Sequence, residues 1–88
     1  MERIALSVAQ ESSQDIKLYT GAYCPYCRRV SKELDRLGLE YESVNADADG
    51  RETVIQLSQQ RAIPVLTIGD EVLVDSTHII RELRRRYA

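Results

Sequence analysis

The period of the apolar residues changes several times along the chain, and each change marks the start of a new element. Residues 16–19 are apolar-rich and lead into a Thr-Gly pair, which predicts a strand followed by a loop. Over residues 25–37 the apolar positions recur at spacings of three and four, as on one side of an amphipathic helix. Pro25 suits the first turn of this helix and Gly38 suits its C-terminal end. The apolar positions are Cys27, Val30, Leu34 and Leu37.

The second half of the chain has shorter apolar segments. Residues 40–44 alternate and predict a second strand, and residues 51–61 predict a second helix. Residues 65–68 form a nearly continuous apolar run, as expected of a central strand buried on both faces. After a Gly-Asp-Glu turn, residues 72–74 predict the return strand of a hairpin. Residues 75–87 begin with capping side chains and continue at helical spacing, which predicts a last helix.

The resulting order of elements is β-α-β-α-β-β-α, which defines an α/β fold. A right-handed parallel crossover is expected to join the first two strands, and the last two strands should pair as an antiparallel hairpin. The four-stranded sheet is therefore mixed, with helices flanking both faces. The polar residues 45–50 are expected to be a loop. We interpret residues 1–14, weakly alternating and then polar, as a flexible N-terminal extension to a single domain at 15–88.

Composition narrows the classes of function. The chain has 88 residues and a net charge near −2, with 12 Lys and Arg against 14 Asp and Glu. A domain of this size can bury one modest core, and a dedicated nucleic-acid binder would normally be basic. No apolar run approaches the roughly 18 residues that span a bilayer, so no membrane partner is expected. Cys24 and Cys27 are the only cysteines, whereas a disulfide-stapled secreted domain usually has more.

The Cys-x-x-Cys pair carries the strongest chemical signal. It can be a redox dithiol, half of a zinc site or two inert cysteines. A structural zinc site normally needs four protein ligands, but besides the two cysteines only His78 and carboxylates remain in this sequence. Its position between a predicted strand and a predicted helix favours the redox interpretation. Cys24 would lie at the helix start, where unpaired N–H groups and the helix dipole stabilise the attacking thiolate. Cys27, one turn further in, would be the less exposed, resolving thiol.

Residues 19–27, Tyr-Thr-Gly-Ala-Tyr-Cys-Pro-Tyr-Cys, resemble the active-site segment of dithiol glutaredoxins. Ile63-Pro64 falls where glutaredoxins and thioredoxins carry a cis-proline, and Asp75-Ser76 falls where glutaredoxins hold the γ-glutamyl end of glutathione. The resemblance covers about residues 16–87. It implies a thioredoxin-like fold whose sheet has the order second, first, third and fourth strand.

The resemblance also implies a glutathione site. The peptide before Pro64 should be cis, as such bonds seldom occur by accident, and it would leave the backbone of Ile63 free to pair with the cysteinyl backbone of glutathione, like one added strand. At the start of the last helix, backbone N–H groups would hold the γ-glutamyl carboxylate. The carboxylate of Asp75 would meet the amino group, with Ser76 beside it. Tyr26 is expected to pack against the tripeptide.

The sequence departs from the family pattern at two places. Gly21 stands where many glutaredoxins carry a Lys that helps to hold the glycine carboxylate, and Arg61 is a candidate for part of that role. Leu-Val replaces the Gly-Gly pair often found before the last helix. Tyr23, next to the first cysteine, is placed at the substrate surface. The Asp-Ser-Thr-His-Ile run also resembles glutathione transferases, but their helical second domain is missing, which disfavours a transferase.

The resemblance implies a cytoplasmic, monomeric, glutathione-dependent oxidoreductase that reduces protein disulfides and glutathionylated proteins. It needs no bound metal or other cofactor, because the two sulfurs carry the electrons and glutathione is the donor. One alternative is a redoxin reduced by a thioredoxin-reductase-type flavoenzyme, for which Gly21 leaves room. Another is a module that binds an iron–sulfur cluster through Cys24 in a dimer, although Pro25 counts against it.

Other patterns have structural interpretations. Residues 45–50 mimic the opening of a calcium loop, but Gln56 stands at the twelfth position, where a bidentate carboxylate is required. A turn and helix cap is the better account. His78 lacks partners for a metal or catalytic role and is expected to be solvated. A cluster of basic residues near the C-terminus complements the helix dipole; nucleic-acid contact is disfavoured by the acidic balance of the chain. The cluster is Arg81, Arg84, Arg85 and Arg86.

Overall fold

The computed structural model describes residues 15–87, so the predicted N-terminal extension lies outside the described residues. No helix within that range is long and apolar enough to cross a membrane. The elements follow the predicted order, with one added 3₁₀ helix. They are β1 (Ile16–Thr20), α2 (Pro25–Arg36), β2 (Glu42–Asn45), η1 (Ala46–Asp49), α3 (Glu52–Ser58), β3 (Val65–Ile68), β4 (Glu71–Val74) and α4 (Ser76–Tyr87).

The four strands form one sheet in the order β2-β1-β3-β4, which confirms the predicted topology. β1 pairs with β2 in parallel, and both the β1–β3 and β3–β4 pairs are antiparallel. Leu18 lies opposite Leu66, and Leu66 lies opposite Leu73, so one face of the sheet carries a row of leucines. The mixed sheet and its flanking helices are those of the thioredoxin-like fold.

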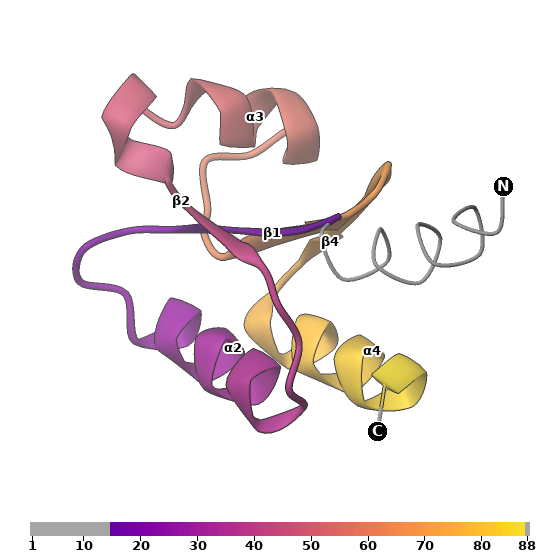
Figure 1. The fold of residues 1–88 in the computed structure, drawn as a ribbon. Coiled ribbons are helices and arrows are strands. Elements are labelled where there is room, and N and C mark those ends of the chain that lie inside the picture. The colour runs from indigo at the N-terminus through magenta and orange to yellow at the C-terminus, as the bar shows by residue number, and fades with distance from the viewer. Residues whose placement is uncertain (1–14, 88) are drawn as a thin grey trace, which may run out of the picture.

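Helices cover both faces of the sheet (Figure 1). α2 and α4 lie together on one face and close the larger core, which includes Leu18 and Leu66. α3 covers the other face, where Tyr19 and Val65 pack with Val54. Successive residues of a strand point to opposite faces, so the adjacent pairs at 18–19 and 65–66 enter different cores. This explains why β3 is apolar at nearly every position.

The second helix is shorter than its apolar pattern predicted. α3 ends at Ser58 rather than at residue 61, and Gln59 follows in the left-handed region at φ 67°. The Ser58 hydroxyl shares its one hydrogen between the carbonyls of Val54 and Gln60, which lie at 2.8 and 3.0 Å. A side chain that satisfies these carbonyls offers the backbone an alternative to further helical turns, so the chain leaves the helix early.

The predicted loop at 45–50 is wrong in part, because it contains the helix η1. The Asn45 side chain accepts a 3.0 Å hydrogen bond from the backbone N–H of Asp47 and so caps η1. Gly50 and Arg51 then take left-handed φ values of 69° and 66°, which end η1 and turn the chain into α3. β2 also starts later than predicted, at Glu42.

Candidate active site

Three segments that are far apart in sequence meet at one edge of the sheet. Tyr19 of β1 lies opposite Val65 of β3, and Val65 lies opposite Val74 of β4. The segment of residues 21–26, which we name the cysteine loop, follows the end of β1. Pro64 immediately precedes β3, and Asp75 immediately follows β4. The strand register therefore brings the cysteine loop, the proline and the start of α4 next to one another, although none of these contacts is local in sequence.

Cys24 is the N-cap residue of α2. Its backbone is extended (φ −128°, ψ 99°), and its Sγ accepts a 3.2 Å hydrogen bond from the backbone N–H of Cys27. Its carbonyl accepts from the N–H of Arg28 at 3.1 Å, which is the first helical bond. Pro25 occupies the first helical position, where the lack of an N–H costs nothing. The sulfur therefore lies at the positive end of a twelve-residue helix.

The two cysteines form a disulfide, with Cα atoms 5.2 Å apart. Cys24 is partly exposed, whereas Cys27 is only 2% exposed and packs in the interior. The first turn of α2 contains no acidic residue, so no nearby carboxylate on that turn opposes negative charge on the sulfur. In the reduced state this geometry stabilises a thiolate at Cys24.

Two clefts flank the disulfide. The thiol cleft, of about 480 Å³, is bordered by the cysteine loop from Gly21 to Tyr26 and by Asp47, Arg51 and Ile63. The proline cleft, of about 360 Å³, is bordered by Tyr26, the segment around Pro64 and residues 74–77. Tyr26 and Ile63 line both clefts, so a bound molecule can extend from the sulfur into the proline cleft.

The residues predicted for glutathione lie around the proline cleft. The Ile63–Pro64 peptide bond is cis. Asp75 takes a left-handed φ of 71°, and its Oδ2 accepts a 3.2 Å hydrogen bond from the backbone N–H of His78. Its carboxylate is exposed, and Ser76 behind it is 6% exposed. Tyr26 is 59% exposed at the border between the clefts.

Tyr23 and Arg61, the other two residues predicted for the substrate site, do not line the proline cleft. Tyr23 is 94% exposed and borders the thiol cleft beside Cys24. The side chain of Arg61 borders neither cleft. Its backbone carbonyl instead accepts a 3.0 Å hydrogen bond from Nη1 of Arg51. The cationic side chain that lines the thiol cleft is therefore Arg51, which forms an ion pair with Asp47 there and which the sequence did not single out.

Arg51 is fixed at the thiol cleft by two contacts. Its Nε donates to Oδ1 of Asp47 at 2.7 Å, and its Nη1 donates to the Arg61 carbonyl. The remaining nitrogen, Nη2, lies 4.0 Å from the position that a Cβ of Gly21 would occupy. Among residues 15–87, no acceptor forms a hydrogen bond with Nη2, so this nitrogen can donate to a ligand in the cleft.

The chain is similar to proteins of known family. The family model for the glutathione S-transferase N-terminal domain matches residues 18–88. A glutaredoxin of Neisseria meningitidis is 31% identical over 71 residues, which are 77% of this chain and 84% of the relative. The chain belongs to the glutaredoxin family. A glutaredoxin of Ricinus communis is 40% identical over 63 residues, which are 66% of this chain but only 62% of that protein.

Solved structures place this glutaredoxin among thioredoxin-like folds. It superposes on reduced glutaredoxin C1 of Populus tremula x tremuloides with a TM-score of 0.70 over 96% of this chain and 78% of that one, at 24% identity. A glutathione transferase of Bombyx mori gives a TM-score of 0.77 at 25% identity, over 85% of this chain and 37% of the transferase. The glutaredoxin thus spans about a third of the transferase chain.

In this glutaredoxin a larger residue at position 21 would have to displace the ends of two neighbouring side chains. A Cβ at this position would lie 2.9 Å from Cδ1 of Ile63 and 3.0 Å from Oδ2 of Asp47. Both distances are shorter than ordinary van der Waals contact. Asp47 is the residue that holds Arg51, so the missing Lys and the added guanidinium belong to one local arrangement.

The acidic residues after β2 serve local structure. Asp47 pairs with Arg51, and Asp49 accepts hydrogen bonds from the hydroxyl and backbone N–H of Thr53, at 2.7 and 3.3 Å. The hydrogen bond from the Thr53 hydroxyl is the largest of the effects that lower the pKa of Asp49. Within residues 15–87 no group of three or more His, Cys, Asp or Glu side chains is arranged to hold a metal ion.

Proposed function

We propose that this glutaredoxin is a glutathione-dependent thiol–disulfide oxidoreductase with Cys24 as nucleophile and Cys27 as resolving thiol. The observation that carries the proposal is the hydrogen bond from the Cys27 N–H to the Cys24 sulfur at the start of α2. It supports a stabilised thiolate on the one cysteine that solvent reaches. Its substrates are protein disulfides and glutathionylated proteins.

Reduction of a protein disulfide takes two exchanges. The Cys24 thiolate attacks one sulfur of the substrate, forms a mixed disulfide and releases the other substrate sulfur as a thiolate. The Cys27 thiolate then attacks the Cys24 sulfur and releases the second substrate thiolate, which leaves the Cys24–Cys27 disulfide. Two electrons pass from the dithiol to the substrate, and both released thiolates take protons from solvent.

Two glutathione molecules restore the dithiol. The first attacks the Cys24 sulfur, which forms a Cys24–glutathione disulfide and frees Cys27. The second attacks the bound glutathione sulfur, which releases oxidised glutathione and the Cys24 thiolate. Glutathionylated proteins enter at the same intermediate, because Cys24 attacks the glutathione sulfur and releases the protein thiol. Cys27 is not needed on that route.

Glutathione binds in the proline cleft with its sulfur toward Cys24. The backbone of Ile63 pairs with the cysteinyl backbone, and Tyr26 packs against the tripeptide. The N–H groups of the first turn of α4 hold the γ-glutamyl carboxylate, and the exposed Asp75 carboxylate meets the amino group. Support for this orientation comes from the lining of the cleft, which includes both the Pro64 segment and residues 74–77.

Arg51 supplies the cation for the glycine carboxylate in this proposal. Its free Nη2 faces the thiol cleft, while Asp47 and the Arg61 carbonyl fix the rest of the guanidinium. A hydrogen bond from a guanidinium N–H to a carboxylate is charge-assisted and stronger than one between neutral groups. A pre-positioned guanidinium also loses little freedom when the ligand binds. Arg51 therefore takes the role that we predicted for Arg61.

The identity of the electron donor is tested by offering the oxidised protein two different reducing systems. The oxidised protein is mixed with glutathione alone, and separately with NADPH and a thioredoxin-reductase-type flavoenzyme. Appearance of two free thiols with glutathione alone supports the proposal. Reduction by the flavoenzyme only would overturn glutathione dependence and assign the protein to reductase-driven redoxins. A brown anaerobic sample with visible absorbance bands would instead point to an iron–sulfur cluster.

A further inference from the structure

The charges of this small protein are unevenly distributed. α2 carries four cations and two anions, and α4 carries four cations and one anion, so the two helices together have a net charge of +5. The whole chain has a net charge of −2, so the rest of the sequence carries −7. α2 and α4 lie side by side on one face of the sheet (Figure 1). That face is therefore strongly basic on an acidic protein.

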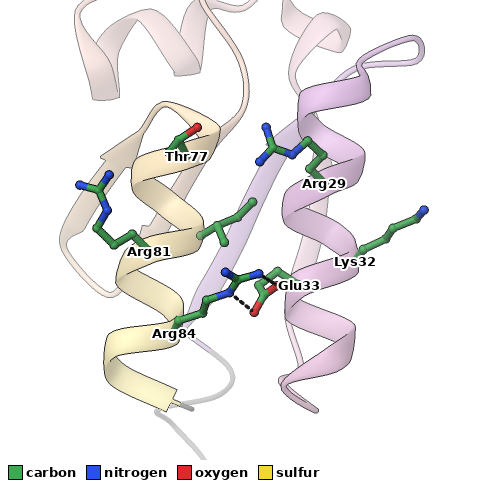
Figure 2. A pocket seen from close by; sticks show the side chains of 7 residues that line it. Arg29, Lys32, Glu33, Thr77, Arg81 and Arg84 are labelled. Atoms are coloured by element: carbon green, nitrogen blue, oxygen red, sulfur yellow. Dashed lines mark hydrogen bonds and ion pairs between the residues drawn. The ribbon is translucent and has the colours of Figure 1, made fainter.

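A groove of about 440 Å³ runs between these two helices (Figure 2). Four cations line it, and its floor is Ile80, which is 8% exposed. Arg29 and Arg84 point over the gap between the helices, and Lys32 and Arg81 lie on its outer flanks. We name this feature the α2/α4 groove. Its lining cations are Arg29, Lys32, Arg81 and Arg84.

One carboxylate, that of Glu33, lies in the groove, and two arginines already form hydrogen bonds with it. Glu33 is 6% exposed and accepts hydrogen bonds from Nε and Nη2 of Arg84, at 3.1 and 3.2 Å, and from Arg36. Among residues 15–87, no carboxylate forms an ion pair with Arg29, Lys32 or Arg81. Within the part of the chain that the structure describes, Arg29, Lys32 and Arg81 therefore have no ion-pair partner around the groove.

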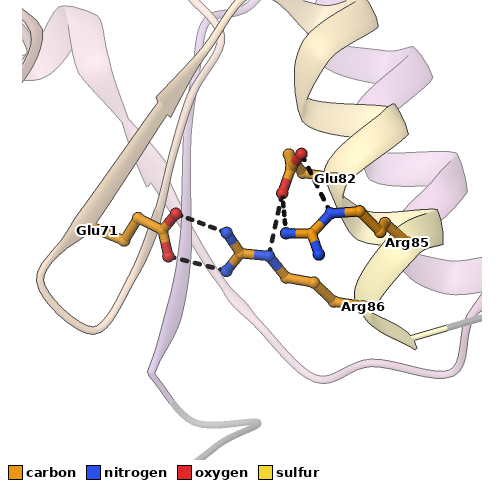
Figure 3. Close-up of polar contacts among 4 residues, drawn as sticks. All are labelled: Glu71, Glu82, Arg85 and Arg86. Atoms are coloured by element: carbon orange, nitrogen blue, oxygen red, sulfur yellow. Dashed lines mark hydrogen bonds and ion pairs between the residues drawn. The ribbon is translucent and has the colours of Figure 1, made fainter.

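The other basic residues of α4 are neutralised (Figure 3). Arg85 pairs with Glu82 at 2.7 Å, and Arg86 bridges Glu82 and Glu71, at 3.3 and 2.5 Å. The C-terminal basic cluster is thus not one uniform patch. Within residues 15–87, the member of this cluster that forms no ion pair is Arg81, which lies on the outer flank of the α2/α4 groove (Figure 2).

The groove is continuous with the active site. Thr77 lines both the proline cleft and the α2/α4 groove. Arg29 lies one turn and a half along α2 from Cys24, so the groove starts close to the reactive sulfur. A chain that presents a cysteine to Cys24 can cross Thr77 and continue between the helices.

We propose that the α2/α4 groove binds an acidic segment that neighbours the disulfide or glutathionylated cysteine of a protein substrate. This inference rests on the proposed function and names its class of substrate. Uncompensated cations lining a cleft attract an anionic partner and raise its rate of association. A long polyanion such as a nucleic acid would extend onto the acidic remainder of the surface, whereas a short acidic segment meets only the groove.

The test compares three glutathionylated peptides that differ only in the residues flanking the cysteine, which are acidic, neutral or basic. We expect kcat/KM for the acidic peptide to exceed that for the neutral one by about tenfold at low salt and to approach it at high salt. Arg29→Gln/Arg81→Gln should abolish this preference while turnover of the neutral peptide is retained. The control Lys17→Gln/Arg85→Gln changes the net charge equally outside the groove and should keep the preference.

A second measurement separates failure of this inference from failure of the proposed function. A cysteine-free fluorescent acidic peptide is titrated with the oxidised protein, and binding is followed by anisotropy. Binding weakened by Arg29→Gln/Arg81→Gln but not by the control supports the groove even if no peptide is reduced. Equal weakening by both variants, no binding at low salt, or tighter binding of a single-stranded oligonucleotide would overturn it.

Discussion

The backbone N–H of Cys27 points at the sulfur of Cys24 over 3.2 Å. This contact is the side-chain cap of α2, in which a sulfur takes the place that Ser or Asp oxygens usually occupy. Cys27 is the third residue of the helix, one of the two positions whose backbone N–H a capping side chain usually binds. In the proposed mechanism, the residue that attacks the Cys24 sulfur would therefore also stabilise the negative charge on that sulfur through its backbone N–H.

Replacement of each cysteine should separate the two routes. Cys24→Ser removes the nucleophile and should abolish both reduction of protein disulfides and deglutathionylation. Cys27→Ser should lose reduction of protein disulfides but retain deglutathionylation, because its backbone N–H still caps the Cys24 sulfur and a second glutathione resolves the intermediate. Both activities are followed by coupled oxidation of NADPH. If Cys27→Ser were as inactive as Cys24→Ser toward a glutathionylated peptide, the monothiol route would be wrong.

Arg51 should affect binding of glutathione more than chemistry. A charge-assisted hydrogen bond contributes about 1.5–3 kcal/mol, so Arg51→Gln should raise KM for glutathione about tenfold with kcat little changed. Asp47→Asn should raise it less, because it keeps the guanidinium and loses one anchor. Arg61→Gln serves as the matched control, since that side chain borders neither cleft. A larger effect of Arg61→Gln than of Arg51→Gln would contradict the assignment.

The central elements could be predicted from sequence because burial imposes a strong pattern. Val65 and Leu66 are both fully buried, on opposite faces of β3, so the run is apolar throughout. Boundaries were less certain where the signal is weak. β2 is an edge strand with mostly exposed residues, which leaves little alternation to mark its start. α3 ends at Ser58 without a Gly or Pro stop signal, so the apolar pattern predicted a longer helix than the one that forms.

The position of Arg51 at the thiol cleft could not be predicted from the sequence, for a different reason. This residue lies 27 residues after Cys24 and belongs to no local motif. The parallel pairing of β1 with β2 places Asn45 beside Thr20, so η1 and the start of α3 lie next to the loop that follows β1. Its role depends on this pairing and on the two left-handed residues that turn the chain at Gly50. Neither feature can be read from residue spacing.

The nearness of the Ile63 side chain to position 21 should be measurable as an energetic coupling between substitutions at the two positions. Gly21→Ala places a Cβ at 2.9 Å from Cδ1 of Ile63, and overpacking of this kind should lower the free energy of unfolding by about 1 kcal/mol. Ile63→Val removes Cδ1, so the double variant should be more stable than the sum of the two single effects predicts. Urea unfolding of the four proteins checks this. Strict additivity would show that the two positions do not interact.

Glu33 should make stability depend on pH in the acid range. Hydrogen bonds from Arg36 and then from Arg84 lower the pKa of this buried carboxyl to about 2, against a usual value of 4.5, despite the opposing effect of burial. Between these two values the unfolded chain binds the proton more readily than the folded protein does. The stabilisation is therefore complete above about pH 4.5 and is lost as the pH falls toward 2. Because both arginines are more than half exposed to solvent, we expect only about 2 kcal/mol from this group.

Two variants isolate this contribution from that of other carboxyls, such as Glu71 and Glu82, whose pKa values arginines also lower. Glu33→Gln cannot titrate, so the difference in unfolding free energy between the wild type and this variant should shrink steadily from pH 4.5 to pH 2.5. Arg36→Gln removes the larger of the two hydrogen-bonding contributions and should move the acid loss to higher pH. Urea unfolding at half-unit intervals of pH measures both. A difference curve that stays level across this range would show that Glu33 does not retain its charge through its two arginines.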